Sequence, residues 1–291
     1  MLFLSAQILS GKIFAQEFKD EAKQEVLALK EQYNITPGLA VIIVGENSAS
    51  KVYVANKHRT CAEVGIYSEV IEMPETTTKA KLIEKINELN TRKDIHGILV
   101  QLPLPKAIAK EETDILNAID PLKDVDGFHP VNVGKLMIGE QDGMVPCTPY
   151  GCLKMLQSAN INIDGANAVI VGRSNIVGKP MAQLLLSQNA TVTVCHSHTK
   201  NLKEICKSAD ILVAAVGRAH FITADMIKPG ATVIDVGINR IAPKKLVGDV
   251  DFDNAVEVAG AITPVPGGVG LLTIAMLMQN AIKAAKLQLA K

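Results

Sequence analysis

The sequence predicts an α/β protein of two domains, built as a doubly wound parallel fold. Short apolar runs rich in Val and Ile alternate along the chain with stretches of helical period, which is the pattern of βαβ units. The chain has 291 residues, 48% of them hydrophobic, so it is long enough to build two cores. Helical crossovers between such strands favour parallel sheets covered by helices.

The predicted strands are apolar, β-branched runs that end at turn-forming or polar residues. They are 39–45, 97–104, 167–172, 191–196, 211–217 and 232–237. The predicted helices repeat their apolar residues every three or four positions. They are 12–32, 79–90, 177–189 and 269–287.

A domain boundary is predicted near PCTPYG (146–151), where Pro and Gly punctuate the chain after the loop-rich GEQDGM. The first domain is then 1–147 and the second 148–269. The last helix, 270–291, follows the Pro/Gly cluster TPVPGGVG (263–270) and is expected to return to the first domain.

The composition indicates small-molecule partners. Thirty basic residues balance thirty acidic ones without a Lys/Arg-rich block, so neither nucleic acid nor a membrane surface is an expected partner. Five scattered cysteines without a CxxC pair favour a reducing compartment. The N-terminal MLFLSAQIL is short and has no leading positive charge, and no apolar run reaches about 18 residues, so we expect a soluble cytoplasmic protein.

The stretch YVANK places Tyr53 and Lys57 four residues apart. On a helix these side chains share one face, so their polar ends can converge on one bound molecule. The spacing alone fits a catalytic pair or two solvated residues on a surface helix, because exposed lysines are common.

The stretch NAVIVGRSNIVGKPMAQLLL is typical of a strand, a tight loop and an amphipathic helix. Gly172 permits the turn, and the helix beginning near Val177 directs free N–H groups toward a bound phosphate. Only Gly172 and Gly178 of a GxGxxG pattern are present, with Arg173 and Ser174 between them, so a plain structural turn is the alternative.

The next strand favours NADP over NAD. NAD-binding units usually carry an acidic residue about 20 residues beyond the glycines. Here TVTVCHSHT contains no carboxylate, and Arg173, Ser197 and His196 would suit a 2′-phosphate. A zinc site at His196 and His198 is disfavoured, because no third ligand follows at suitable spacing, and we expect no metal.

Two other stretches carry polar residues in rigid surroundings. In VQLPLPK (100–106), Gln101 ends a strand before two prolines, at the edge where open α/β sheets bind ligands. In KDVDG, Asp124 and Asp126 lie in a Gly-terminated loop. One carboxylate could accept two N–H bonds from a guanidine-like heterocycle edge, or the loop could be an Asx-turn; calcium would need more oxygen ligands.

Taken in order, YVANK, VQLPLP, KDVDG, PCTP, VGRSNIVGKP, VGINR, GDV and TPVPGGVG resemble the bifunctional methylenetetrahydrofolate dehydrogenase/methenyltetrahydrofolate cyclohydrolase family over essentially the whole chain. The resemblance implies an N-terminal folate-binding domain that faces a Rossmann-like NADP-binding domain across one cleft, commonly in a homodimer formed through the nucleotide domains. It also implies two reactions. Hydride passes from 5,10-methylenetetrahydrofolate to NADP, and water then opens the methenyl cation to 10-formyltetrahydrofolate.

The resemblance also assigns roles. Lys57 would activate water or shuttle protons, provided that burial or the cationic substrate lowers its pKa. Tyr53 would stack on the folate, Gln101 would orient Lys57, and Asp126 would pair with the pterin edge. The backbone at Pro264, Gly267 and Gly268 would approach the folate. The implied dinucleotide contacts are Gly172, Arg173, Ser174, Ser197 and Ile238.

One departure is Leu271, where the family usually has Pro, a residue favoured in the first turn of a helix. A short-chain dehydrogenase, which also uses Tyr-x-x-x-Lys, is excluded because its glycine loop precedes the pair. Two alternatives remain: a dehydrogenase without cyclohydrolase activity, and a catalytically idle folate or nucleotide binder.

Overall fold

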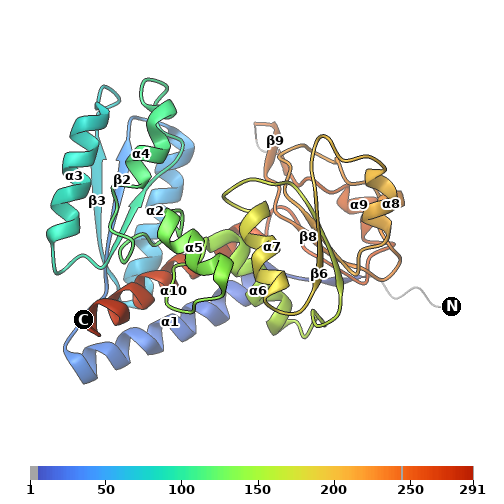
Figure 1. The fold of residues 1–291 in the computed structure, drawn as a ribbon, viewed down its shortest axis with the longest axis horizontal. Helices are drawn as coiled ribbons and strands as arrows, with labels where there is room; N and C mark the ends of the chain where they lie inside the picture. Colours follow the sequence, from blue (N-terminus) through green and yellow to red (C-terminus); the bar gives the residue numbers. More distant parts are fainter. Residues whose placement is uncertain (1–5, 244, 291) are drawn as a thin grey trace. The chain divides into compact units, whose positions relative to one another are not determined.

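The computed structural model describes residues 6–243 and 245–290, which form two compact units (Figure 1). We name each unit after its sheet. The three-stranded unit comprises Gln16–Cys147 and the chain from Ile274 onward. The six-stranded unit comprises the residues up to Ala15 and Thr148–Thr273. The first five residues of MLFLSAQIL lie outside the described part of the chain.

The three-stranded unit is built on a parallel sheet. Its strands, in the spatial order β3-β2-β4, are β3 (Tyr67–Met73), β2 (Gly38–Val44) and β4 (Gly97–Val100). Every residue of the central strand β2 is buried, which explains its uninterrupted apolar sequence.

Helices cover both faces of this sheet. They are α2 (Ser48–Val64), α3 (Lys79–Thr91), α4 (Glu112–Leu116) and α5 (Pro130–Ile138), with the 3-10 turn η1 (Ala109–Glu111). Ala40, Ile42 and Val44 of β2 belong to one core cluster with three buried residues of α3, namely Leu82, Ile86 and Leu89. Since side chains alternate along a strand, the other face of β2 is left for α2, which contacts both β2 and β3.

Two long helices, α1 (Gly11–Tyr33) and α10 (Val269–Leu289), begin in the six-stranded unit and continue into the three-stranded one. Within the latter they lie side by side (Figure 1). Lys286 pairs with Glu25, and the Gln279 side chain donates to the carbonyl of Phe18 at 3.2 Å. The predicted return of the C-terminal helix is therefore confirmed.

The six-stranded unit contains a fully parallel sheet. Its spatial order is β1 (Gln7–Ile8), β11 (Ala261–Ile262), β8 (Thr232–Asp235), β7 (Ile211–Ala214), β5 (Asn167–Val171) and β6 (Thr191–Cys195). Val171 pairs with both Cys195 and Ala214, so these strands end level with one another. The chain order reverses between β5 and β7, and such a switch point is where open α/β sheets bind ligands.

The helices of this unit are α6 (Cys147–Ser158), α7 (Gly178–Leu186), α8 (Leu202–Lys207) and α9 (Phe252–Ala255), with the 3-10 turn η2 (Ala224–Met226). A two-stranded antiparallel ribbon, β9 (Asn239–Ala242) and β10 (Lys245–Val247), stands apart from the main sheet. Helix α7 contacts β5 and β6, as expected for a βαβ crossover.

The structure differs from the sequence predictions in several places. It adds β3, whose residues are mostly half-buried and mix charged with apolar side chains, and the short strands β1, β9, β10 and β11. The PCTPYG stretch, where a domain boundary is predicted, begins helix α6 at Cys147, and the chain passes from one unit to the other between Cys147 and Thr148. Residues 7–8 were assigned to the domain 1–147 but pair with β11 in the six-stranded sheet, because a two-residue strand carries no signal of its partner.

Among the described residues, no helix combines the length and apolar character that a membrane span requires.

Candidate active site

Helix α2 carries Tyr53 and Lys57 into the three-stranded unit. Asn47 caps the helix by accepting from the backbone N–H of Ser50 at 3.0 Å, and Gly65 ends it in the left-handed conformation at φ 88°. Lys57 is buried, with 9% of its surface exposed, whereas Tyr53 is 42% exposed. The pair is therefore not two solvated residues: only its tyrosine faces solvent.

Gln101 is brought to Lys57 by the β2–β4 pairing. Its backbone N–H donates to the carbonyl of Ile42 at 2.8 Å, which extends the ladder by one residue past β4. Lys57 Nζ donates to Gln101 Oε1 at 2.9 Å, and Gln101 Nε2 donates to the carbonyl of Leu102 at 2.7 Å. The second bond fixes which end of the amide faces Lys57. The predicted Lys57–Gln101 contact is confirmed.

The two carboxylates of KDVDG have different surroundings. Asp124 is buried and accepts from the N–H of His129 at 2.8 Å and from Asn132 Nδ2 at 2.9 Å, so its carboxylate is used by the protein's own donors, five and eight residues further along the chain. Asp126 accepts no hydrogen bond from the described residues. Burial raises the pKa of Asp126 to about 6, while the charge of Lys57 lowers it and that of Asp124 raises it.

The electrostatic coupling places Asp126 near Lys57, so one cluster contains Lys57, Gln101 and Asp126. Asp126 is the carboxylate of this loop left available to a ligand. A buried amine beside a half-buried carboxylate can bind a polar heterocycle and move protons, which is the chemistry implied by the family resemblance.

Two further residues border this cluster and were not singled out by sequence reasoning. Asn280, on α10, is buried and donates through Nδ2 to the carbonyls of Val125 and Val145, each at 2.8 Å. The thiol of Cys147 lies 3.5 Å from the same Val125 carbonyl, and burial raises its pKa well above the usual value. The signal for Asn280 is an amide inside the apolar stripe of a helix, where unpaired polar groups are costly.

The glycine loop lies at the carboxyl end of β5. Gly172 has φ 130°, and a Cβ on it would come within 2.2 Å of the carbonyl oxygen of Ala215, after β7. A Cβ on Gly178 would approach the carbonyl oxygen of Gly172 to 2.2 Å. These two glycines therefore let the strand, the loop and α7 pack closely, as phosphate-binding turns require.

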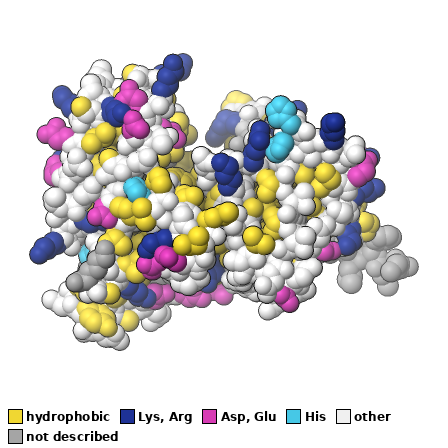
Figure 2. All heavy atoms as spheres, viewed as in Figure 1, with side chains coloured by type: hydrophobic (Ala, Val, Ile, Leu, Met, Phe, Trp, Pro, Cys, Tyr) yellow, Lys and Arg dark blue, Asp and Glu magenta, His cyan; other side chains and the backbone are white. Residues whose placement is uncertain are grey.

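The predicted contacts around this loop are exposed. Arg173 and Ser174 follow Gly172, and Ser197 lies two residues after β6. Because Val171 pairs with Cys195, both loops leave the same edge of the sheet. Lys, Arg and His side chains gather on the upper face of this unit in Figure 2, which suits an anion.

Ser174 has a role that the sequence did not suggest. Its Oγ accepts from the N–H groups of Val177 at 3.1 Å and Gly178 at 3.4 Å. The N–H groups predicted to be free at the start of α7 are therefore partly occupied by this side-chain cap.

The remaining predicted residues also lie on loops of the six-stranded unit. Ile238 follows β8 and is 49% exposed. In TPVPGGVG, Pro264 is half-buried, Gly267 is exposed with φ 102°, and Gly268 is buried. Gly267 accepts from the N–H of Gly11 at 2.8 Å, and a Cβ on Gly268 would approach the Pro264 oxygen to 2.4 Å.

Two buried carboxylates behind these loops were not predicted. Asp249 accepts from three successive backbone N–H groups, those of Val216, Gly217 and Arg218, at 2.6–2.9 Å. Asp235, at the end of β8, accepts from the N–H groups of Gly237, Asp249 and Val250 at 2.9 Å. Burial raises the pKa of Asp235 to about 6. Their signal is an acidic residue within or beside an apolar strand.

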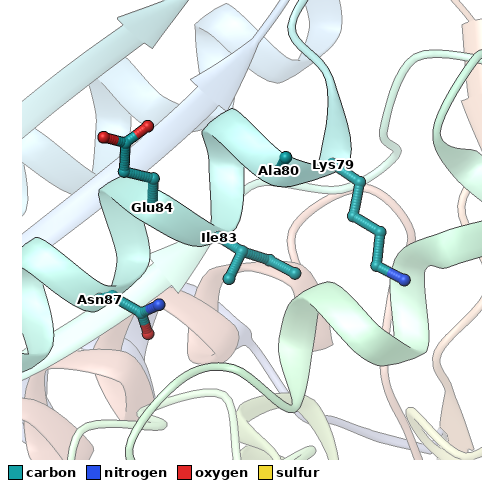
Figure 3. A pocket seen from close by; sticks show the side chains of 5 residues that line it. All are labelled: Lys79, Ala80, Ile83, Glu84 and Asn87. Carbon is teal, nitrogen blue, oxygen red and sulfur yellow. The ribbon is translucent and has the colours of Figure 1, made fainter.

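Two other features carry no catalytic assignment. A hollow along α3 is lined by Lys79, Ala80, Ile83, Glu84 and Asn87 and contains none of the predicted site residues (Figure 3). In the part of the chain that the structure describes, no group of three or more His, Cys, Asp or Glu could hold a metal ion. The Nδ1 atom of His196 instead accepts from the backbone N–H of His198 at 3.1 Å.

Comparison with known proteins agrees with this geometry. Residues 9–126 match the catalytic domain, and residues 146–289 the NAD(P)-binding domain, of the tetrahydrofolate dehydrogenase/cyclohydrolase family. The chain belongs to this family. The activities in its name are those of the chain: it is a bifunctional methylenetetrahydrofolate dehydrogenase and methenyltetrahydrofolate cyclohydrolase.

Individual relatives match over almost their whole length. The chain is 60% identical to the bifunctional protein FolD of Acetivibrio thermocellus over 285 residues, covering 98% of this chain and 99% of that one. The FolD dehydrogenase/cyclohydrolase structure from Campylobacter jejuni is 48% identical with a TM-score of 0.94, covering 98% of this chain and 100% of that chain. The Trypanosoma brucei FolD structure, complexed with NADP and an inhibitor, is 38% identical with a TM-score of 0.93, covering 99% and 100%.

Proposed function

We propose that this enzyme oxidises 5,10-methylenetetrahydrofolate with NADP and then hydrolyses the methenyl product to 10-formyltetrahydrofolate. The observation that carries the proposal is the partly buried Lys57–Gln101 hydrogen bond beside the Asp126 carboxylate. Addition of water to a methenyl cation requires a group that removes and returns protons, and a side-chain amine held in one orientation can do so. We assign folate to the three-stranded unit and NADP to the six-stranded unit.

The proposed roles in folate binding follow from exposure and charge. Asp126 pairs with the amino-pyrimidine edge of the pterin, because its carboxylate accepts no hydrogen bond from residues 6–243 or 245–290. Tyr53, whose ring is largely exposed one turn from Lys57, stacks on the folate. We keep the contacts of Pro264, Gly267 and Gly268 with the folate as part of this proposal.

Gln101 is the proposed positioning residue for the amine. Its own amide is held by the carbonyl of Leu102, so Lys57 Nζ meets an acceptor of fixed direction. Lys57 then activates the attacking water or carries protons during ring opening.

NADP is the proposed dinucleotide because the residues at the ends of β5 and β6 suit a 2′-phosphate. Arg173 and Ser197 are exposed there, and residues 195–199 include no carboxylate that would repel the phosphate. When bound, the dinucleotide supplies the acceptor for the hydride. Gly172, Ser174 and Ile238 are proposed to contact the rest of the cofactor.

We also propose a homodimer formed through the six-stranded unit. β6 is the last strand of the sheet within the described part of the chain, and its Val194 is 37% exposed, so it presents an edge that a second copy can cover. Sedimentation equilibrium should give a dimer, and Val194→Lys should shift the protein toward monomer. A wild-type monomer would contradict this assignment. The free state of all five buried cysteines supports a reducing, cytoplasmic setting.

To test the proposed reaction, purified protein is given methylenetetrahydrofolate with either NADP or NAD. The formation of reduced nicotinamide and of methenyltetrahydrofolate is then followed separately by absorbance. We expect faster reduction of NADP than of NAD, with 10-formyltetrahydrofolate appearing and little methenyl compound accumulating. Stoichiometric accumulation of the methenyl compound, beyond its spontaneous hydrolysis, would contradict the role of Lys57.

A further inference from the structure

The side chain of Asp249 accepts four hydrogen bonds and lies outside the predicted site. Its side chain is completely buried. Oδ2 accepts from the backbone N–H groups of Val216 at 2.6 Å and Gly217 at 2.9 Å, and Oδ1 accepts from Arg218 N–H at 2.8 Å and from Asn239 Nδ2 at 2.9 Å. One carboxylate thus holds two loops that are separated by about twenty residues of sequence.

Both of these loops leave the ligand-binding edge of the sheet. The loop of Val216 to Arg218 follows β7, and Asn239 comes directly after Ile238, in the loop that follows β8. The β7 loop lies at the reversal of strand order between β5 and β7, where a Cβ on Gly172 would meet the oxygen of Ala215 at 2.2 Å. The loops held by Asp249 are therefore next to the glycine turn and to the exposed Ile238.

Asp235 fixes Asp249 in turn. It accepts from the backbone N–H of Asp249 through Oδ1 and from that of Val250 through Oδ2. Asp235 N–H donates to Thr263 Oγ1 at 2.7 Å, and this links the pair to the start of TPVPGGVG. Position 248, beside both carboxylates, requires glycine, because a Cβ added there would lie 1.8 Å from Asp235 Oδ2. The position of the Asp249 carboxylate is consequently determined by the sheet and not by a flexible loop.

We propose that Asp249 is a positioning residue of the dinucleotide site, which shapes the β7 loop and the Ile238 segment for the cofactor without contacting it. This inference rests on the proposed assignment of NADP to the six-stranded unit. A loop whose three successive backbone N–H groups already bind one side-chain carboxyl group is ordered before the cofactor arrives. Dehydrogenase activity depends on that loop, whereas hydrolysis of methenyltetrahydrofolate requires no dinucleotide.

The test compares Asp249→Asn with a matched control, Asp253→Asn, on the exposed surface of α9. Asn keeps the side-chain volume and one acceptor oxygen, but it replaces the other oxygen with an NH2 group that faces backbone N–H donors, so the loops lose half of their common acceptor. We expect KM for NADP to rise about tenfold or more. Hydrolysis of supplied methenyltetrahydrofolate should change less than about threefold, and the control should resemble wild type in both assays.

A merely structural role predicts a different pattern. Asp249→Asn would then lower Tm, but well below Tm its KM for NADP would equal that of wild type, and this result would overturn the proposal. Equal loss of both activities would overturn it as well. NADP should also raise the Tm of the variant less than that of wild type at the same concentration, because ligand stabilisation follows affinity.

Asn239→Ala provides a second variant in case Asp249→Asn does not fold. It removes a single donor, and Asp249 keeps its three backbone partners. We expect a rise in KM for NADP of about threefold, in the same direction, with hydrolysis unchanged. An unchanged KM in this variant would contradict the coupling of Asp249 to the Ile238 segment.

The failure of this inference can be distinguished from the failure of the proposed function. If wild-type protein prefers NAD, the NADP assignment fails. The positioning role of Asp249 is then tested by the ratio of the KM for NAD of Asp249→Asn to that of wild type. If wild type uses NADP and Asp249→Asn retains its KM, the function stands and the positioning role fails.

Discussion

The Lys57 cluster and the dinucleotide loops of the six-stranded unit hold their polar groups in different ways. Lys57 is buried and its amine is fixed directly by the side chain of Gln101. Arg173 and Ser197 are exposed. In the same unit, the buried Asp249 carboxyl group accepts hydrogen bonds from the loops that follow β7 and β8. A group that moves protons benefits from being held in one orientation away from bulk water, whereas a group that binds an anion must reach it from the surface.

Single substitutions should therefore act differently in the two units. In the three-stranded unit a change removes a reacting or binding group and also alters the charge of a buried cluster. In the six-stranded unit a change removes one of several contacts, so its effect should be smaller and confined to the cofactor. The predictions below test this difference.

The largest effect is expected from Lys57→Met. Loss of the amine should lower the rate of methenyltetrahydrofolate hydrolysis by about 10²–10⁴-fold, the usual contribution of a general acid–base group. NADP affinity, measured by titration calorimetry, should stay within about twofold of wild type, since the amine lies in the other unit. Lys51→Met on the same helix, whose amine pairs with Glu46, is the control and should hydrolyse normally. Normal hydrolysis by the Lys57 variant would remove this residue from the mechanism.

Asp126→Asn should change the pH dependence of stability. The pKa of Asp126 is about 6 in the folded state and 3.8 without the protein environment, so the folded state binds this proton more tightly. Stability attributable to the group is therefore greatest below pH 3.8 and falls as the pH rises to about 6. The variant should gain at most about 3 kcal/mol over wild type above that pH, and nothing at the acidic end.

Urea unfolding of wild type and variant between pH 4.5 and 8 measures this gain. Asp142→Asn serves as a control of opposite sign, because the Lys135 ammonium lowers the pKa of Asp142. That carboxylate stabilises the fold above its unfolded pKa, so its removal should cost some stability at pH 7. A gain for Asp126→Asn that does not grow with pH would contradict the assigned burial of this carboxylate.

Arg173→Ala should weaken NADP binding by about tenfold or more, the effect of losing one charged hydrogen bond, while the affinity for NAD should change by less than about threefold. Titration of each dinucleotide measures the two affinities, and Lys207→Ala, on the exposed surface of α8, is the control. Equal weakening of both dinucleotides would show that Arg173 does not meet a 2′-phosphate.

The smallest effect is expected from Ser174→Ala. Its Oγ accepts from the N–H groups at the start of α7, so the loss of this cap should lower the free energy of unfolding by about 1 kcal/mol. Urea unfolding measures the change, and Ser174→Thr should restore most of it. An unchanged free energy for the alanine variant would mean that the cap contributes nothing in solution.

Much of the fold could be predicted from the sequence because its central strands are buried on both faces. Such strands, for example β2 and β5, are continuous apolar runs with little ambiguity. β3 was missed because its half-buried residues mix charge with apolar side chains, and β1 and β11 were missed because two residues make no pattern. These strands are defined by their partners, which are distant in sequence.

The site shows the same division. Local sequence placed Tyr53 and Lys57 one helical turn apart and indicated a turn at Gly172, and the order of the motifs matched the family. Local spacing could not bring Gln101 to Lys57, 44 residues away, nor distinguish Asp124 from Asp126; both assignments came from the family resemblance. It also gave no role to Asp249.

The sequence by itself thus determined the α/β class, the main helices and strands, and the family, since periodicity and short motifs are local properties. Only the tertiary structure decided the strand order, the burial of Lys57 and the loops gathered around Asp249. The physical reason is that sheet pairing and burial depend on contacts between distant segments, and burial sets both the pKa of Asp126 and the strength of the bonds to Asp249.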